Sequence, residues 1–208
     1  MINQDNSNSE EAFWTKRYLE HQTGWDIGKP STPLKAYIDQ IENKNLKILI
    51  PGAGNSYEAE YLFNKGFNNV YVLDISKEPL DNFKKRVPHF PFNQVIHDDF
   101  FSHNEQYDLI FEQTFFCSFT PTKSNRQSYT SKVFDLLNEN GKLVGLWFKF
   151  PLTDNMEKRP FGGSKEEYLN YLNPYFEVKS FNECYNSIES RTDNELFGIF
   201  VKKSVALV

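Results

Sequence analysis

The sequence predicts an α/β fold in which a mostly parallel sheet carries helices on both faces. Three observations lead to this fold class: short apolar segments alternate with longer amphipathic ones, glycines stand where amphipathic segments end, and no internal repeat divides the chain. Strict alternation of strand and helix favours parallel strands joined by right-handed crossovers. At 208 residues we expect one domain over residues 11–208, behind a flexible leader at 1–10.

The N-terminal part of this domain is predicted to be helical. Two helices at 11–20 and 34–42 flank a Gly/Pro-rich link at 24–33. We expect residues 11–44 to form a helical lid over the carboxyl ends of the strands.

The first five strands are short, apolar and rich in β-branched or aromatic residues. They are expected at 46–51, 70–74, 94–97, 107–112 and 142–150. Helical spacing and glycine stop signals predict three helices between them. These are expected at 57–65, 77–86 and 124–140.

After residue 150 the alternation stops. A loop with Pro151, Pro160 and two glycines leads to a short helix at 164–172. Two further strands, at 176–184 and 195–202, follow with no helix-length segment between them, which is typical of antiparallel pairing. The predicted sheet therefore has seven strands and is mostly parallel, with an antiparallel last strand.

Composition and charge disfavour several functions. The chain has 28 acidic and 23 basic residues, a net charge of −5, which suits neither a nucleic acid nor an anionic membrane. No apolar segment reaches the ~20 residues that cross a bilayer, and the polar N-terminus is not a signal sequence, so we expect a cytoplasmic protein. Cys117 and Cys184 are too few for a disulfide scaffold and indicate free thiols. The four histidines lack metal-ligand spacing, and no metal is expected.

The carboxyl ends of three successive strands carry the candidate binding residues. The first strand runs into a turn with Gly52 and Gly54, which lets the backbone approach a ligand. Asp74 ends the second strand, where a carboxylate accepts hydrogen bonds from ribose hydroxyls. Asp99 and Phe100 follow the third and offer a polar contact and a ring for a purine. Each has an ordinary interpretation as a turn or cap, but together they predict a nucleoside site.

The glycine turn argues against a dinucleotide. Tyr57 stands where the G-x-G-x-x-G fingerprint needs its third glycine, and acidic Glu58 follows. The Asp74 carboxylate would also repel a 2′-phosphate. A nucleoside without phosphate indicates S-adenosylmethionine, and a nicotinamide-dependent oxidoreductase stays the weaker alternative.

Several motifs of the chain resemble the thiopurine S-methyltransferase family, and most closely its thiol and halide methyltransferase branch. They are FWTKRYLEHQTGWDIGKP at 13–30, IPGAGN at 50–55, DDFF at 98–101, DLIFEQTFFCSFTP at 108–121, Arg126, and RPFGGS at 159–164. The resemblance spans residues 13–202. It implies a class I, Rossmann-like methyltransferase fold and an S-adenosylmethionine-dependent enzyme that methylates sulfur, in a thiol, hydrosulfide or thiopurine, or a halide.

Position by position, the resemblance implies a set of cofactor-binding residues. They are Trp14, Tyr18, Trp25, Gly52, Gly54, Asp74, Asp99, Phe100 and Gln113. Tyr18 replaces a position that is usually Trp, and Gln113 stands where the thiol and halide branch has Tyr and thiopurine enzymes have Arg, which leaves the acceptor open. The aromatic residues suit a sulfonium, a cation that binds ring faces. Helix packing is their alternative interpretation.

The acceptor is expected beside the fourth strand. Phe115 and Phe116 follow that strand as a substrate wall, and the Arg126 guanidinium would favour a thiolate. A buried apolar corner and a solvated helix residue are the alternatives. Arg191 matches a basic position of the family and either closes over the site or is a surface charge. Cys117 lacks an adjacent base and is expected to be inert.

The sequence leaves the catalytic residues unassigned, because methyl transfer to a soft nucleophile needs no general base. We expect a small-molecule acceptor as partner, with no nucleic acid or membrane, and a monomer or weak dimer. A cofactor-binding module without turnover is the alternative from another functional class.

Overall fold

The computed structural model describes residues 4–153, 155 and 159–204. Its strands form one seven-stranded sheet within these residues. The strands are β1 (Ile48–Pro51), β2 (Val70–Asp74), β3 (Val95–His97), β4 (Tyr107–Gln113), β5 (Leu137–Phe148), β6 (Phe176–Glu183) and β7 (Glu195–Lys202). Their order across the sheet is β3-β2-β1-β4-β5-β7-β6.

The strand directions confirm the predicted sheet. All pairings from β3 to β5 are parallel, and β7 is antiparallel to both of its neighbours, β5 and β6. The order reverses between β1 and β4, since each side of the sheet is built outward from that pair. Open α/β sheets bind ligands at such a switch point, outside the carboxyl ends of the strands.

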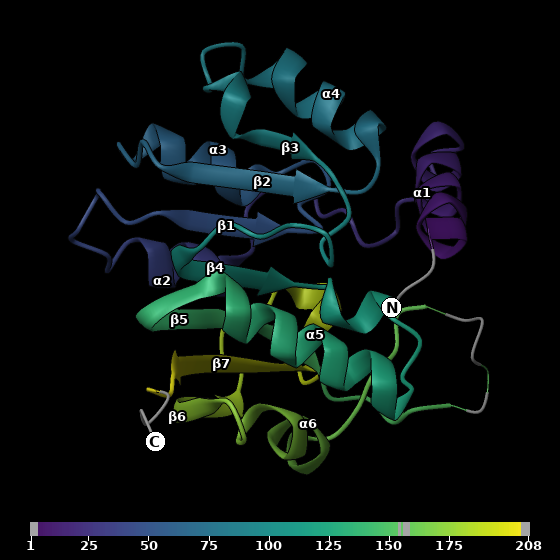
Figure 1. Cartoon of the computed structure of the whole chain (residues 1–208), viewed down its shortest axis with the longest axis vertical. Coiled ribbons are helices and arrows are strands. Elements are labelled where there is room, and N and C mark those ends of the chain that lie inside the picture. The colour runs from purple at the N-terminus through teal and green to yellow at the C-terminus, as the bar shows by residue number, and fades with distance from the viewer. Residues whose placement is uncertain (1–3, 154, 156–158, 205–208) are drawn as a thin grey trace.

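Helices cover both faces of this sheet (Figure 1). They are α1 (Gln4–Leu19), α2 (Thr32–Ile38), α3 (Tyr57–Asn64), α4 (Lys77–Arg86), α5 (Lys123–Leu136) and α6 (Lys165–Leu172), with short 3₁₀ turns at η1 (Phe92–Gln94), η2 (Phe116–Ser118) and η3 (Glu189–Arg191). Thr122 and Ser164 cap α5 and α6, because each side-chain oxygen accepts a backbone N–H of the first turn at 3.1 Å.

Each face of the sheet carries its own hydrophobic cluster. Ile48 and Ile50 of β1 belong to the cluster that includes side chains of α2, α3 and α4, whereas Leu49 belongs to the one that includes side chains of α5 and α6. This division follows from the alternation of side chains along a strand. The central parallel strands are buried on both faces, which explains their nearly continuous apolar sequence. Both clusters pack against the same sheet.

Two boundaries differ from the prediction. Helix α1 begins at Gln4, so residues 4–10, expected in a flexible leader, are helical, while residues 1–3 lie outside the described residues. Residues 137–140, expected at the end of a helix, are strand because Leu137 pairs with Tyr107 of β4. The partner that makes residue 137 part of a strand is remote in the sequence and leaves no local pattern.

Helix α1 lies beside the carboxyl ends of the strands, where the lid was expected (Figure 1). Thr15 Oγ1 is 2.9 Å from Ser76 Oγ, just beyond β2, and Glu11 Oε1 is 3.1 Å from His97 Nε2 at the end of β3. These contacts attach the helix to the β2–β3 side of the sheet.

Helix α2, which was also expected in the lid, instead packs through Leu34 and Ile38 into the hydrophobic cluster on one face of the sheet. Among the described residues, we find no helix with the length and apolarity that spanning a membrane requires.

A close approach between β4 and β5 makes Gly145 a sensitive position. A Cβ there would lie 2.3 Å from the Glu112 carbonyl oxygen and 2.4 Å from the Glu112 Cβ. We expect Gly145→Ala to lower the free energy of unfolding by about 1–3 kcal/mol through overpacking, as measured by urea denaturation. Gly24→Ala is the matched control, since a Cβ on Gly24 meets nothing within 4 Å. Equal midpoints for both variants would contradict this account.

Candidate active site

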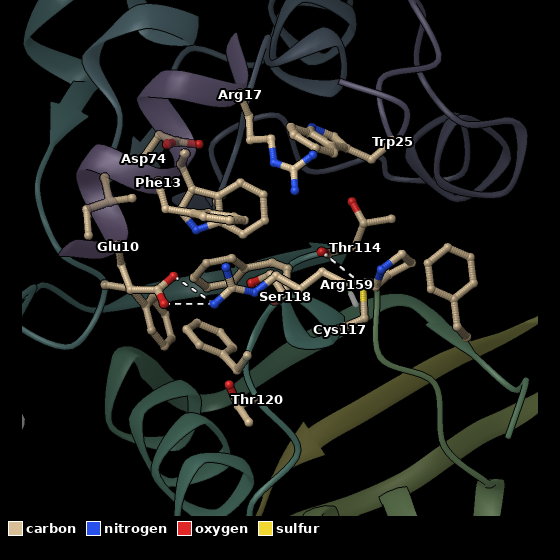
Figure 2. Close-up of a pocket in the computed structure, with 18 of the residues that line it drawn as sticks. Glu10, Phe13, Arg17, Trp25, Asp74, Thr114, Cys117, Ser118, Thr120 and Arg159 are labelled. Atoms are coloured by element: carbon tan, nitrogen blue, oxygen red, sulfur yellow. Dashed lines mark hydrogen bonds and ion pairs between the residues drawn. The ribbon is translucent and has the colours of Figure 1, made fainter. Parts of the chain in front are cut away.

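A cavity of about 960 Å³ opens at the carboxyl ends of the strands. Its wall comes from α1, the segment that follows it, the turn after β1, the ends of β2, β3 and β4, and the loops after β5 and before β7 (Figure 2). This volume lies at the upper end of the range of about 300–1,000 Å³ for ligand sites. The cavity therefore has room for two ligands beside each other.

Asp74 fixes the turn after β1. Its Oδ2 accepts the Gly54 N–H and its Oδ1 accepts the Ser76 N–H, both at 2.8 Å. Gly52 and Gly54 have φ values of 56° and 53°, in the left-handed region that favours glycine. Burial raises the pKa of Asp74 to about 6. The carboxylate lines the cavity and keeps lone pairs for ligand hydroxyls.

Asp99 and Phe100 form the next part of the wall. The Asp99 carboxylate accepts the Phe101 N–H at 3.2 Å, and partial burial raises its pKa. The Phe100 ring stacks on Tyr129 with centroids 5.7 Å apart and meets Phe115 edge-on at 5.1 Å. Both predicted residues line the cavity.

Three aromatic residues from the N-terminal part complete the opposite wall. The Trp25 ring packs edge-on against the rings of Trp14 and Tyr18, with centroids 5.3 and 5.8 Å apart. The Tyr18 hydroxyl approaches Gly54 so closely that a Cβ on that glycine would lie 2.8 Å from it. Burial raises the pKa of Tyr18, so its hydroxyl stays protonated. All three residues line the cavity.

Two predicted cofactor residues line a smaller space instead. Gly54 and Gln113 border a cavity of about 60 Å³ between the segment after Trp25 and the glycine turn. Within the described residues, the buried Gln113 Oε1 has no hydrogen-bond partner. Such an acceptor calls for a donor from a ligand or water.

Two of the three predicted acceptor residues lie outside the cavity wall, and only Phe115 lines it. Phe116 is buried and packs edge-on against Tyr129 and Tyr168, with centroids 4.9 and 5.5 Å apart. It belongs to the apolar corner that was its alternative interpretation.

Arg126 also corrects the prediction. Only 2% of its side chain is exposed, and its Nη1 donates to Glu167 Oε1 at 2.6 Å. Its Nη2 donates to the Gly162 carbonyl at 2.7 Å. A guanidinium engaged in this way joins α5 to α6 and to the loop before it, and is neither an acceptor ligand nor a solvated surface charge.

Glu112 is a buried residue that the sequence reasoning missed. Its Oε1 accepts the Phe115 and Phe116 N–H groups at 2.9 Å, and its Oε2 accepts the Tyr129 hydroxyl at 2.5 Å. Burial raises the pKa of Glu112 to about 7. The sequence did carry a signal, namely an acidic residue near the end of an apolar strand. Such a residue is buried with the strand, and a buried carboxylate needs hydrogen-bond donors around it.

Arg159 and Arg191 line the cavity, and the sequence analysis named only one of them as a candidate. Arg191, for which closure over the site or a surface position was left open, lines the cavity and donates to the Trp25 carbonyl at 2.8 Å and to Glu195 at 3.3 Å. Arg159 was missed as a site residue, although it lies in the RPFGGS motif. It pairs with Glu10 of α1 at 2.7 Å (Figure 2).

Cys117 lines the cavity but is chemically quiet. Its Sγ donates to the Thr114 carbonyl at 3.1 Å, and burial raises the pKa of the thiol, which keeps it protonated. No group of three or more His, Cys, Asp or Glu side chains is placed to hold a metal in the described part of the chain.

The wall suits a nucleoside that carries a sulfonium. Carboxylates accept from hydroxyls, rings face a cation, and a left-handed glycine turn brings backbone close to a ligand. The model of the thiopurine S-methyltransferase (TPMT) family matches residues 9–206. The chain belongs to the thiopurine S-methyltransferase family. It is an S-adenosylmethionine-dependent methyltransferase.

Plant enzymes are among the relatives of this methyltransferase. It is 29% identical over 204 residues to the probable thiol methyltransferase 2 of Arabidopsis thaliana, which covers 95% of this chain and 88% of the relative. It is 28% identical over 202 residues to thiocyanate methyltransferase 1 of Brassica oleracea, which covers 93% of this chain and 86% of the relative.

Solved structures show the same fold. The 1,6-didemethyltoxoflavin-N1-methyltransferase of Burkholderia thailandensis, with bound S-adenosylhomocysteine, has a TM-score of 0.78 at 11% identity and covers 98% of this chain and 92% of its own. The magnesium protoporphyrin IX methyltransferase of Synechocystis has a TM-score of 0.73 at 14% identity, and the match covers 98% of this chain and 100% of the Synechocystis chain. The predicted class I fold is thereby confirmed.

The raised pKa of Asp74 gives cofactor binding a pH dependence. Above about pH 6 the carboxylate is ionised and accepts from hydroxyls, and below it the group is protonated. We expect the affinity for S-adenosylhomocysteine to fall by up to about tenfold per pH unit below this value, measured by calorimetry. Asp74→Asn should bind more weakly at neutral pH, with a flatter profile. Parallel profiles would assign the titration to another group, such as Asp99.

The burial of Arg126 predicts a structural role. Arg126→Ala leaves Glu167 without its partner, and we expect the free energy of unfolding to drop by about 3 kcal/mol. The folded fraction should bind S-adenosylhomocysteine as the unchanged protein does. Lys149→Ala is a control, since it removes a more exposed ion pair with Glu183. Unchanged stability with weaker acceptor binding would restore the acceptor role.

Proposed function

We propose that this methyltransferase acts on the sulfur of a small acceptor, as a thiolate, hydrosulfide or thiopurine. The observation that carries the proposal is the wall beyond β4, where Phe115 and Phe119 face a cavity that Arg159 and Arg191 also line. Rings strip water from a polarizable anion, and a guanidinium holds its charge. The names of the plant relatives, for thiol and thiocyanate methylation, support the same acceptor class.

We assign the cofactor to the side of β2 and β3. The Asp74 and Asp99 carboxylates would hold the ribose and adenine, with Phe100 against the base. The rings of Trp14, Tyr18 and Trp25 would face the sulfonium. Gly52 and Gly54 allow close backbone approach beside them. The unpaired Gln113 Oε1 suits the ammonium group at the methionine end.

When bound, S-adenosylmethionine supplies an electrophilic methyl group. The acceptor sulfur forms a bond to this carbon as the carbon–sulfonium bond breaks, and the proton of the thiol goes to solvent. The chain's own task is to hold the partners close and dry, which is worth up to about 7–11 kcal/mol. A thiol with a reference pKa near ~8.5 is already partly ionised, and nearby guanidinium groups favour the thiolate further.

The buried polar groups beside β4 are unsuited to proton transfer. Glu112 is held by two backbone N–H groups and by Tyr129. Cys117 donates to a carbonyl and stays protonated. This arrangement agrees with a reaction in which the acceptor arrives as an anion. Halide methylation requires the same arrangement and remains part of the proposal. The monomeric or weakly dimeric state and the cytoplasmic location likewise remain proposals.

A panel of acceptors tests the sulfur assignment. With cofactor labelled on the methyl group, we expect transfer to thiols, hydrosulfide or thiocyanate, at rates that rise with the ionised fraction of the thiol. Catechols, amines and carboxylates should accept little label, because a strongly hydrated oxygen or nitrogen loses more on entering an aromatic wall. Volatile and non-volatile products are counted separately. Methylation of a catechol with none of any sulfur or halide acceptor would refute the proposal, and cofactor binding without transfer would favour a binding module.

A further inference from the structure

Three arginines among the described residues line the cavity, and they differ in how firmly they are held. Arg17 donates to Gln22 Oε1 at 3.1 Å and lies over the Phe13 ring. Arg191 is buried and is bound by Glu195 and by a backbone carbonyl.

Arg159 is held by the Glu10 carboxylate, whose oxygens lie 2.7 and 3.0 Å from the same Nη2 (Figure 2). The Glu10 side chain is 45% exposed, and that of Arg159 is 19% exposed. An ion pair with one exposed carboxylate contributes little to stability. Another carboxylate can therefore replace that of Glu10 at the Arg159 guanidinium.

The Arg159 guanidinium also lies over two aromatic rings of α1. Its Cζ lies 4.5 Å from the centroid of the Phe13 ring and 5.1 Å from that of Trp14. The rings pack against the guanidinium, while both Glu10 oxygens bind the same nitrogen, Nη2. A planar donor set of this kind binds carboxylates with two hydrogen bonds, which an ammonium group does not.

The topology puts Arg159 on the acceptor side. Asp74 and Asp99 follow β2 and β3, on one side of the switch point between β1 and β4. Arg159 lies in the loop after β5, on the other side, and closes the cavity together with α1. A nucleoside on the first side leaves the second side to the acceptor, and Arg159, which comes from that second side and reaches Trp14 of α1, lies where the two ligands would meet.

We propose that Arg159 is a specificity-determining residue that recognises a carboxylate on the acceptor, and that Glu10 occupies this position until the acceptor displaces it. The inference rests on the proposed sulfur methylation and adds the chemical class of its substrate, a small thiol that carries a carboxylate. The Arg159–Glu10 ion pair shows that a carboxylate fits against the guanidinium. Displacement moves the Glu10 side chain into solvent, where it is already half exposed.

The experiment compares an acid with its uncharged counterpart. Mercaptoacetate and its amide are the two thiols, and (methylthio)acetate and its amide are non-reacting ligands for calorimetry with S-adenosylhomocysteine bound. We expect Arg159→Ala to lower kcat/KM for mercaptoacetate, and affinity for (methylthio)acetate, by about 10- to 100-fold. For the amides the change should stay within about threefold. Each ratio compares two proteins on one ligand, so the pKa of the thiol cancels.

Further variants separate recognition from folding. Glu10→Gln removes the competing charge and should tighten binding of the acid while leaving that of the amide unchanged. Arg159→Lys keeps the charge but loses the planar donor set, and should recover only part of the selectivity. Lys149→Ala removes a cation that is paired outside the cavity, and it should change the affinity for neither the acid nor the amide.

The outcomes are distinct. Equal losses for acid and amide in Arg159→Ala, or weaker acid binding in Glu10→Gln, would make the pair a structural contact and overturn the inference. Preferential, Arg159-dependent binding of the acid without methylation of any thiol would instead refute the sulfur chemistry and leave the recognition site standing.

Discussion

Buried carboxylates at the ends of strands hold the turns from which the site is built. Asp74 accepts backbone N–H groups of Gly54 and Ser76, and Glu112 accepts those of Phe115 and Phe116. A buried charge is tolerated only when hydrogen bonds replace water, so each carboxylate and its turn require one another. Because both strands end at the same edge of a parallel sheet, these turns face a common cavity, and the remaining wall is assembled around them.

Helix α1 completes the enclosure by joining the two sides of that edge. Its Glu11 and Thr15 contact the ends of β3 and β2, and its Glu10 reaches the loop after β5. Trp14 meanwhile contacts Trp25 in the following segment. None of its described side chains belongs to either hydrophobic cluster, so the position of the helix depends on these polar and aromatic contacts. The wall of the cavity can therefore change shape most easily where α1 meets the loop after β5, which is the side on which we place recognition of the acceptor charge.

The sequence was sufficient for the elements whose pattern is local. The strands at 70–74 and 195–202 and the helix at 77–86 are found within their predicted bounds, because dense apolar runs and clear stop signals surround them. That Gly52, Asp74 and Asp99 line one cavity was also predictable, since glycines and acids at the ends of parallel strands meet at one edge of the sheet. The features that could not be predicted depend on partners remote in the sequence. Leu137 joins a strand because it pairs with Tyr107. Arg126 and Arg159 have buried or partly buried positions in which they pair with Glu167 and Glu10, respectively. No local signal reports a contact between residues so far apart in the chain.

The two sides of the cavity consequently differ in how freely their residues can change. Asp74 and Glu112 each support backbone of the site, so replacing either disturbs the turns as well as any ligand contact. Arg159 and Glu10 interact through side chains on a loop and a helix, and their loss removes a partly exposed ion pair that contributes little to stability. Binding residues on loops above a rigid sheet can be exchanged without loss of the fold. An enzyme built in this way keeps its cofactor chemistry fixed by the sheet, while the acceptor it selects is set by the charges placed on the segments that close over the edge.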